Sequence, residues 1–150
     1  GVLENKIDVI ATDHAPHTLE EKSKTYFNAP SGGPLVQHAL LSLMEHYHDG
    51  KITIEKIAEK TSHALSECFG IPDRGYIREG YYADLVLINP NKGFQVTESN
   101  LLYKCKWSPF EHYTFRFTIE KTFVNGNLVF DNNNFDESIK GQRLAFTGLN

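Results

Sequence analysis

The residues with the clearest chemical potential lie in one short stretch, DVIATDHAPHT, at positions 8–18. It passes from an apolar run into Asp13, His14 and His17, with Pro16 between the two histidines. A carboxylate can bind a metal ion or move a proton, and an imidazole can bind a metal, donate a hydrogen bond or hold an anion. The proline restricts the relative direction of the histidines. The stretch is therefore a candidate for catalysis and ligand binding.

Each of these side chains also has an ordinary structural interpretation. An aspartate directly after a strand often caps a helix or makes loop hydrogen bonds. A metal site needs three or four ligands, and no other cluster in the sequence supplies them. The spacing alone does not decide whether Asp13 has a functional or a structural role. It also does not decide whether His14 and His17 bind a ligand or have no chemical role.

A strand over 7–12, IDVIAT, is the element that would present Asp13. Its nearly continuous apolar run is typical of a strand buried on both faces of a parallel sheet. Active sites gather at the carboxyl ends of such strands. Because the sequence offers no earlier strand as a neighbour, we expect the chain to be the end of a longer protein. The loop over 12–33 has a length typical of functional or disordered segments.

Three helices are predicted after that loop. The first begins at Pro34, which suits the first helical position, and ends at Gly50. The second is capped by Thr53, and the third runs from about Ser62 to Gly70. The apolar positions expected to face inward are Leu35, Val36, Ala39, Leu40, Leu43, Met44 and Tyr47, then Ile54, Ile57 and Ala58, then Ala64, Leu65, Cys68 and Phe69.

Helical periodicity ends near residue 70, and β-branched and aromatic residues take over. Strands are predicted over 83–90 and 93–97, followed by a hairpin over 113–131. The Asn-Gly pair at 125–126 marks the hairpin turn, because both central residues must tolerate positive φ. The polar tail beyond is expected to be loosely held. Four aromatic residues are assigned to the core of this β part: Trp107, Phe110, Tyr113 and Phe115.

The composition indicates a soluble globular protein that does not bind nucleic acid or membranes. The net charge is −4 with both signs interspersed, whereas nucleic-acid binding needs a basic stripe. No apolar run is long enough to cross a bilayer. Cys68 and Cys105 lie far apart without metal-ligand spacing, and they indicate reduced thiols in a cytoplasmic protein.

The segment IATDHAPHTLEEK, residues 10–22, resembles the segment after the eighth barrel strand of dihydroorotases, which belong to the amidohydrolase superfamily. Related hydantoinases, dihydropyrimidinases and allantoinases share the Asp-His pair but usually lack the second histidine and the TxEEK run. The segments GYIREGYYADLVLINP and KWSPFEHYTFRFTIEKTFVNGNLVF resemble strands of the small β domain of the superfamily. The resemblance covers nearly the whole chain.

This resemblance implies an α/β fold in which residues 1–70 are the last strand and helices of a TIM-barrel amidohydrolase. Residues 71–150 would be the C-terminal part of a small β-sandwich domain. It also implies the reversible cyclisation of N-carbamoyl-L-aspartate to dihydroorotate, a step of pyrimidine biosynthesis, at a binuclear zinc site.

The resemblance also implies a role for individual residues. Asp13 would bind one zinc ion and act as the general base. His17 would hold the α-carboxylate of the small-molecule substrate, and backbone groups of the loop from Ala29 to Gly33 would contact the substrate. His14 would support Asp13 without binding the metal itself.

The remaining metal ligands of the family, and the residues that share the substrate carboxylate with His17, have no counterpart in this sequence. We therefore expect the chain to be inactive by itself and to bind little zinc. An unpaired barrel strand exposes its edges, so we also expect a homo-oligomer. Two alternatives stay open: another cyclic-amide hydrolase, such as an allantoinase or dihydropyrimidinase, or a non-catalytic scaffold with the amidohydrolase fold.

Overall fold

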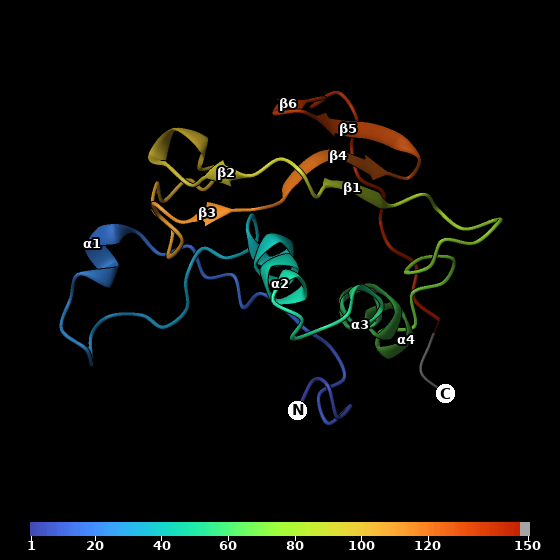
Figure 1. Ribbon diagram of the computed structural model, residues 1–150, viewed down its shortest axis with the longest axis horizontal. Coiled ribbons are helices and arrows are strands. Elements are labelled where there is room, and N and C mark those ends of the chain that lie inside the picture. Colours follow the sequence, from blue (N-terminus) through green and yellow to red (C-terminus); the bar gives the residue numbers. More distant parts are fainter. Residues whose placement is uncertain (148–150) are drawn as a thin grey trace.

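A computed structural model describes residues 1–147, and Figure 1 shows helices lying on one side of two small antiparallel sheets. The helices are α1 (Leu19–Lys22), α2 (Ala39–His48), α3 (Ile54–Ala58) and α4 (Ala64–Cys68), with a π-helical segment, Glu59–His63, between α3 and α4 and a short 3-10 helix at Glu98–Asn100. The strands are β1 (Leu85–Asn89), β2 (Phe94–Gln95), β3 (Thr114–Phe115), β4 (Thr118–Val124), β5 (Asn127–Asp131) and β6 (Asn134–Phe135). One sheet has the order β1-β4-β5-β6, and the other pairs β2 with β3.

The predicted strand over 7–12 is not formed. Near it lies a single parallel bridge between His14 and Gly33, and the amide of Ile10 donates to the carbonyl of Lys60 at 3.0 Å. A parallel strand exists only when neighbours exchange hydrogen bonds with it. Within residues 1–147 no other segment supplies such a neighbour for this stretch.

The sequence predicts that this helix begins at Pro34. In the structure α2 begins at Ala39. The amides of residues 35–37 are bound by two distant side chains instead. The His14 imidazole accepts from two of them, and the Tyr103 hydroxyl accepts from the amide of Gln37 at 2.9 Å. These acceptors hold residues 36–38 in a turn ahead of the helix.

The second and third predicted helices form one continuous helical run, α3 to α4, through the π-helical segment. Thr53 caps it as predicted, by accepting from the amide of Lys56, and Gly70 follows its end with φ of +58°. The π-helical segment changes the residue repeat and therefore rotates the face that follows. Cys68 and Phe69 are exposed, contrary to prediction, and Ile54 at the first turn is exposed too.

The β part follows the sequence prediction closely. Strands β1 and β2 fall inside the predicted segments, and β4 and β5 form the hairpin around Asn125 and Gly126, with φ of +52° and +81°. The tail beyond is held at two points, by β6 and by the amide of Thr147, which donates to the carbonyl of Gly70 at 2.7 Å. The end of the predicted loose tail, 148–150, lies outside the described residues.

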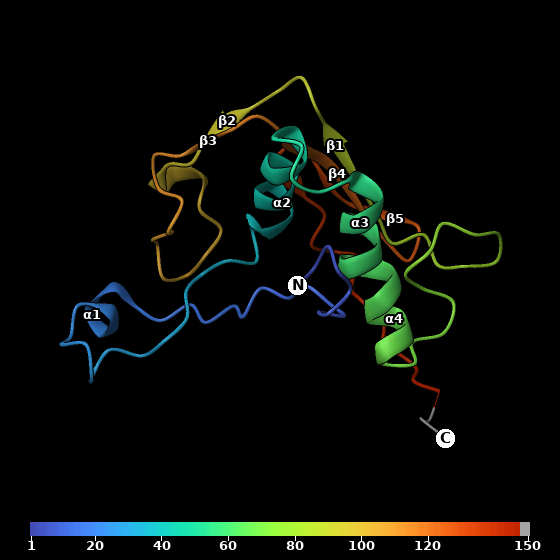
Figure 2. The same ribbon diagram turned by 60° about the horizontal axis from the view of Figure 1, so that its bottom comes forward.

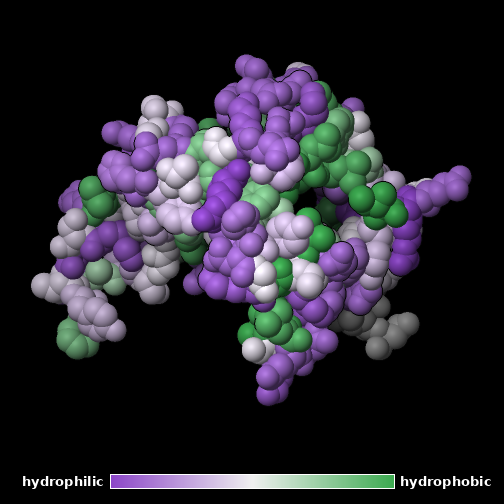
Figure 3. All heavy atoms as spheres, in the orientation of Figure 1, coloured by the Kyte–Doolittle hydropathy of each residue, from purple (hydrophilic) through white to green (hydrophobic). Residues whose placement is uncertain are grey.

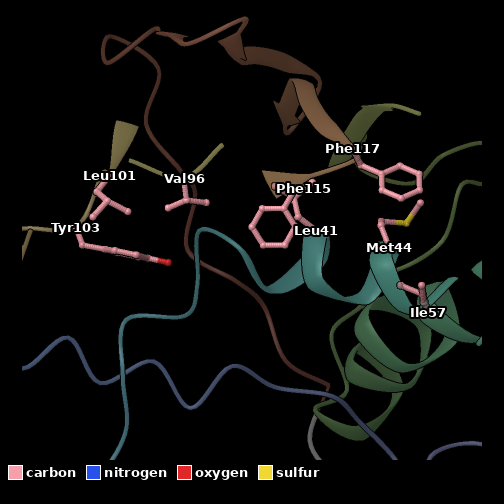
Figure 4. Close-up of a cluster of buried hydrophobic side chains, with 8 residues drawn as sticks. All are labelled: Leu41, Met44, Ile57, Val96, Leu101, Tyr103, Phe115 and Phe117. Atoms are coloured by element: carbon pink, nitrogen blue, oxygen red, sulfur yellow. The ribbon is translucent and has the colours of Figure 1, made fainter. Parts of the chain in front are cut away.

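Helix α2 and the strands share one hydrophobic core. Figure 4 shows Leu41 of α2 beside Phe115 of β3, and Met44 of α2 between Phe117 and Ile57. The core residues that are buried are Leu41, Met44, Ile57, Val96, Leu101, Tyr103, Phe115 and Phe117. This core ties α2 and α3 to both sheets.

His38, the residue before α2, is fully buried among aromatic rings. Its ring centroid lies 5.6 Å from that of Phe115 and 5.8 Å from that of Phe110, and its Nε2 atom has no hydrogen-bond partner within residues 1–147. Burial lowers the pKa of the His38 imidazole from 6.5 to about 4. The imidazole is therefore neutral at pH 7 in the folded chain.

We expect the free energy of unfolding to decrease as the pH falls from 6.5 towards 4. A group whose pKa is depressed by folding stabilises the fold above its unfolded pKa, and this contribution, up to about 3 kcal/mol for His38, is lost on acidification. Chemical denaturation at a series of pH values measures it. The variant His38→Phe should flatten this part of the profile, whereas His46→Gln on the exposed side of α2 should not. An unchanged profile in His38→Phe would contradict this assignment.

Candidate functional site

The candidate site is built on a closed loop, residues 14–33. Its ends are joined by the bridge between His14 and Gly33 and by the amide of Ala15, which donates to the carbonyl of Gly33 at 3.0 Å. Gly32 next to this junction has φ of +83°, and a Cβ atom there would lie 2.6 Å from that of Ala15, so only glycine fits. Figures 1 and 2 show that the loop, with α1, extends away from the other helices and strands.

Helix α1 is a structured element inside what the sequence predicts as a loop. Thr18 and Glu21 form a reciprocal capping box: the amide of Thr18 donates to the carboxylate of Glu21 at 2.7 Å, and the amide of Glu21 donates to the hydroxyl of Thr18. The hydrogen bonds from the backbone and side chain of Thr18 lower the pKa of Glu21, so its carboxylate is ionised at neutral pH. The sequence signal for this helix is the Thr-x-x-Glu spacing.

Lys22 joins α1 to the returning arm of the closed loop. Its Nζ atom donates to the carbonyl oxygen of Pro30 at 2.6 Å and to that of Gly32 at 3.0 Å. The lysine of the TxEEK run therefore has a structural role, because it holds the returning arm of the loop against α1.

Asp13 lies immediately before the closed loop, with an exposed side chain and a left-handed backbone at φ of +46°. Aspartate tolerates this conformation better than most residues, and such outliers are enriched at functional sites. Within residues 1–147 no hydrogen bond joins His14 to Asp13. The Nδ1 atom of His14 accepts from the amides of Leu35 and Val36 at 3.1 and 3.3 Å, which requires an unprotonated Nδ1.

His17 is half-buried and held from two sides. Its Nδ1 atom lies 3.7 Å from a carboxylate oxygen of Glu21, and its backbone carbonyl accepts from the indole Nε1 of Trp107 at 2.7 Å. The same indole packs on Gly33, where a Cβ atom would lie 3.7 Å from Cη2. The structure therefore brings two of the predicted substrate-binding residues, His17 and Gly33, together.

Ala29, the third predicted substrate-binding residue, lies on the returning arm of the loop. Its amide donates to the carbonyl of Thr25 at 2.9 Å, and within the described chain no hydrogen bond joins it to His17 or Gly33. The assignment of Trp107 to the β core is wrong, since the indole is half-buried and its N–H contacts the loop. Tyr113 is also exposed, at 43%, and Phe115 is buried as predicted.

The described residues do not form a metal site by themselves. No group of three or more His, Cys, Asp or Glu side chains within 1–147 could hold a metal ion. A zinc site needs three or four protein ligands, and Asp13 alone cannot meet that need.

The Amidohydrolase family profile matches residues 1–129, so the chain belongs to the amidohydrolase family. Among its curated relatives dihydroorotase is the most frequent name, which confirms the resemblance found in the sequence. The chain is 38% identical over 130 residues to a dihydroorotase of Halobacterium salinarum, a match that covers 87% of this chain and 31% of the relative. It is 31% identical over 130 residues to an allantoinase of Desulfitobacterium hafniense, with 86% and 29% covered.

The fold also matches solved amidohydrolase structures. A dihydropyrimidinase from Brevibacillus agri NCHU1002 superposes with a TM-score of 0.82 at 23% identity, over 89% of this chain and 30% of that one. The chain thus spans less than a third of the length of these relatives. No helix within residues 1–147 is long and apolar enough to cross a membrane.

Proposed function

We propose that this sequence is the C-terminal part of a dihydroorotase, which interconverts N-carbamoyl-L-aspartate and dihydroorotate in pyrimidine biosynthesis. The observation that supports this most is His17, four positions after Asp13. Its backbone carbonyl accepts from Trp107, and the Glu21 carboxylate lies 3.7 Å from its Nδ1 atom. Dihydroorotate carries a carboxylate, which an imidazole can bind, whereas allantoin and dihydrouracil carry none. The relatives named dihydroorotase, at 38% and 34% identity, agree with this choice.

In this proposal residues 1–70 are the end of a (β/α)8 barrel and residues 71–150 are part of a small β-sandwich domain. The likeness to hydantoinase and dihydropyrimidinase structures supports it. The unpaired apolar stretch 7–12 would become a strand when the neighbouring barrel strands lie beside it. The free thiols of Cys68 and Cys105 support a cytoplasmic location.

The chemistry proposed for this chain is proton transfer by Asp13. In ring opening, water adds to the amide carbonyl and the ring C–N bond breaks. The carboxylate of Asp13 takes the proton of the water and passes it to the leaving nitrogen, and ring closure reverses these steps. Zinc, bound by Asp13 together with ligands outside this sequence, would polarise the carbonyl. His17 would hold the substrate carboxylate, and the backbone at Ala29 and Gly33 would contact the ring.

The variant His17→Asn in the full-length enzyme tests this function. We expect KM for dihydroorotate to rise by about 10- to 100-fold, because a charge-assisted hydrogen bond is lost. KM for dihydrouracil, which has no carboxylate, should not change. His46→Asn, at an exposed position of α2, serves as the control. Equal losses on both substrates would favour the second candidate, an uncharged cyclic amide as in the allantoinase relative.

We also propose that the chain self-associates. Strand β1 is an edge of its sheet, and its residues Val86 and Leu87 are 45% and 44% exposed. Figure 3 shows hydrophobic residues gathered on the surface around β1. An exposed apolar edge strand favours pairing with another copy. Size-exclusion chromatography should therefore give more than a monomer, and a clean monomer at all dilutions would contradict the proposal.

A further inference from the structure

We infer that Trp107 is a positioning residue for substrate binding: its indole fixes His17 and, through it, the site for the substrate carboxylate. This inference rests on the proposed function, because it takes His17 as the carboxylate-binding residue. Trp107 comes from the β part, 90 positions further along the chain, and no local sequence pattern places it at the loop.

The indole contacts both arms of the closed loop. Its Nε1–H donates to the carbonyl of His17 at 2.7 Å, and its six-membered ring packs against Gly33. Gly33 is in turn bridged to His14, the residue after Asp13. One side chain therefore fixes the distance between the outgoing arm at His17 and the returning arm at Gly33.

The imidazole of His17 is directed by a second contact. The carboxylate of Glu21 lies 3.7 Å from Nδ1, and Glu21 is itself held by the amide and hydroxyl of Thr18. Trp107 thus holds the backbone of His17, and the Glu21 carboxylate lies on the Nδ1 side of its ring. Nε2 is the nitrogen that remains for a ligand, and neither Trp107 nor Glu21 occupies it within the described contacts.

The segment that carries the indole is itself anchored. Tyr103 is buried and accepts from the amide of Gln37 just before α2, and Ser108 is buried with its hydroxyl accepting from the amide of Phe110. An anchor of this kind can hold the loop in place only if it does not move with it. The β part therefore serves as the fixed base against which His17 is positioned.

Trp107 would offer the substrate no hydrogen bond, because its only N–H is used by the carbonyl of His17. Its loss should weaken binding of the carboxylate equally in the ground state and the transition state. Such uniform binding appears in KM and not in kcat. A residue that only supports the fold would instead lower activity on every substrate alike.

The test is Trp107→Phe in the full-length enzyme, because phenylalanine keeps an aromatic ring beside Gly33 but has no N–H. We expect KM for dihydroorotate to rise by about three- to ten-fold, the effect of one lost hydrogen bond. The kcat, and the KM for dihydrouracil, should stay unchanged. Tyr113→Phe is the control, since it removes a polar group from an exposed ring of the same β part.

A double-mutant cycle with His17→Asn shows whether the effect passes through His17. Trp107→Phe should add nothing to KM in the His17→Asn background. Full additivity, or an equal loss of activity on dihydroorotate and dihydrouracil, would overturn the inference.

Hydrogen exchange of the indole N–H separates this inference from the proposed function. In the full-length enzyme with 15N-labelled tryptophan, the resonance lost in Trp107→Phe should exchange slowly. Exchange as fast as that of free tryptophan overturns the positioning contact whatever the substrate is. An enzyme that does not turn over dihydroorotate but keeps the slow exchange overturns the proposed function while the positioning of His17 stands.

Discussion

Replacing Asp13 by asparagine in the full-length enzyme should lower kcat by about 10²- to 10⁴-fold, the usual contribution of a general acid or base. Asparagine has nearly the same size and tolerates the left-handed backbone found at this position, φ of +46°. The fold should therefore be unchanged, and the lost activity reports the lost carboxylate, while the zinc content of the variant shows whether a metal ligand was lost as well. Steady-state kinetics with dihydroorotate and with N-carbamoyl-L-aspartate measure both directions.

Both directions should fall by the same factor, because one carboxylate takes the proton in ring opening and returns it in ring closure. Asp49→Asn is the control, since Asp49 is an exposed carboxylate at the end of α2 that has no proposed role. If Asp13→Asn kept the activity of the parent enzyme, Asp13 would not be the proton-transfer group.

Replacing Phe115 by alanine should lower the free energy of unfolding by about 3 to 5 kcal/mol, the usual cost of removing a fully buried phenylalanine. Phe115 is 0% exposed and lies where α2 meets β3. Its ring centroid is 4.8 Å from that of Tyr113 and 5.3 Å from that of Phe110. The surrounding rings come from several elements and cannot close the resulting cavity together. Urea denaturation measures the change.

Phe27→Ala is the matched control for this substitution. Phe27 is 96% exposed on the closed loop, and its only ring neighbour in the described chain is Tyr26, at 5.4 Å. Its removal should change the free energy of unfolding by less than about 0.5 kcal/mol. Similar costs for Phe115→Ala and Phe27→Ala would mean that the aromatic cluster around His38 does not stabilise the fold.

The local features of the fold could be predicted from the sequence because short-range chemistry determines them. The turn at Asn125 and Gly126 needs positive φ, and Thr53 caps a helix with its own side chain. The strand at 7–12 could not be judged this way, because a parallel strand depends on neighbours far away in the chain. The start of α2 likewise depends on His14 and Tyr103, which no local pattern reveals.

The candidate site likewise contains residues that the sequence reveals and residues that only the structure reveals. Asp13 and His17 stand out because their residue types and spacing match a motif, and the Thr-x-x-Glu spacing at Thr18 and Glu21 is a local signal for α1. Trp107 could not be found from the sequence, since its bond to His17 joins positions 90 residues apart. Lys22 belongs to the TxEEK run, yet its bonds to the carbonyls of the returning arm follow only from the closed loop.

The substrate preference of the full-length enzyme tests the proposed function most directly. The ratio kcat/KM should be measured for dihydroorotate, dihydrouracil and allantoin under the same conditions. We expect dihydroorotate to be preferred by at least about 100-fold, because only this substrate offers a carboxylate to His17. A preference for allantoin or dihydrouracil would contradict the assignment.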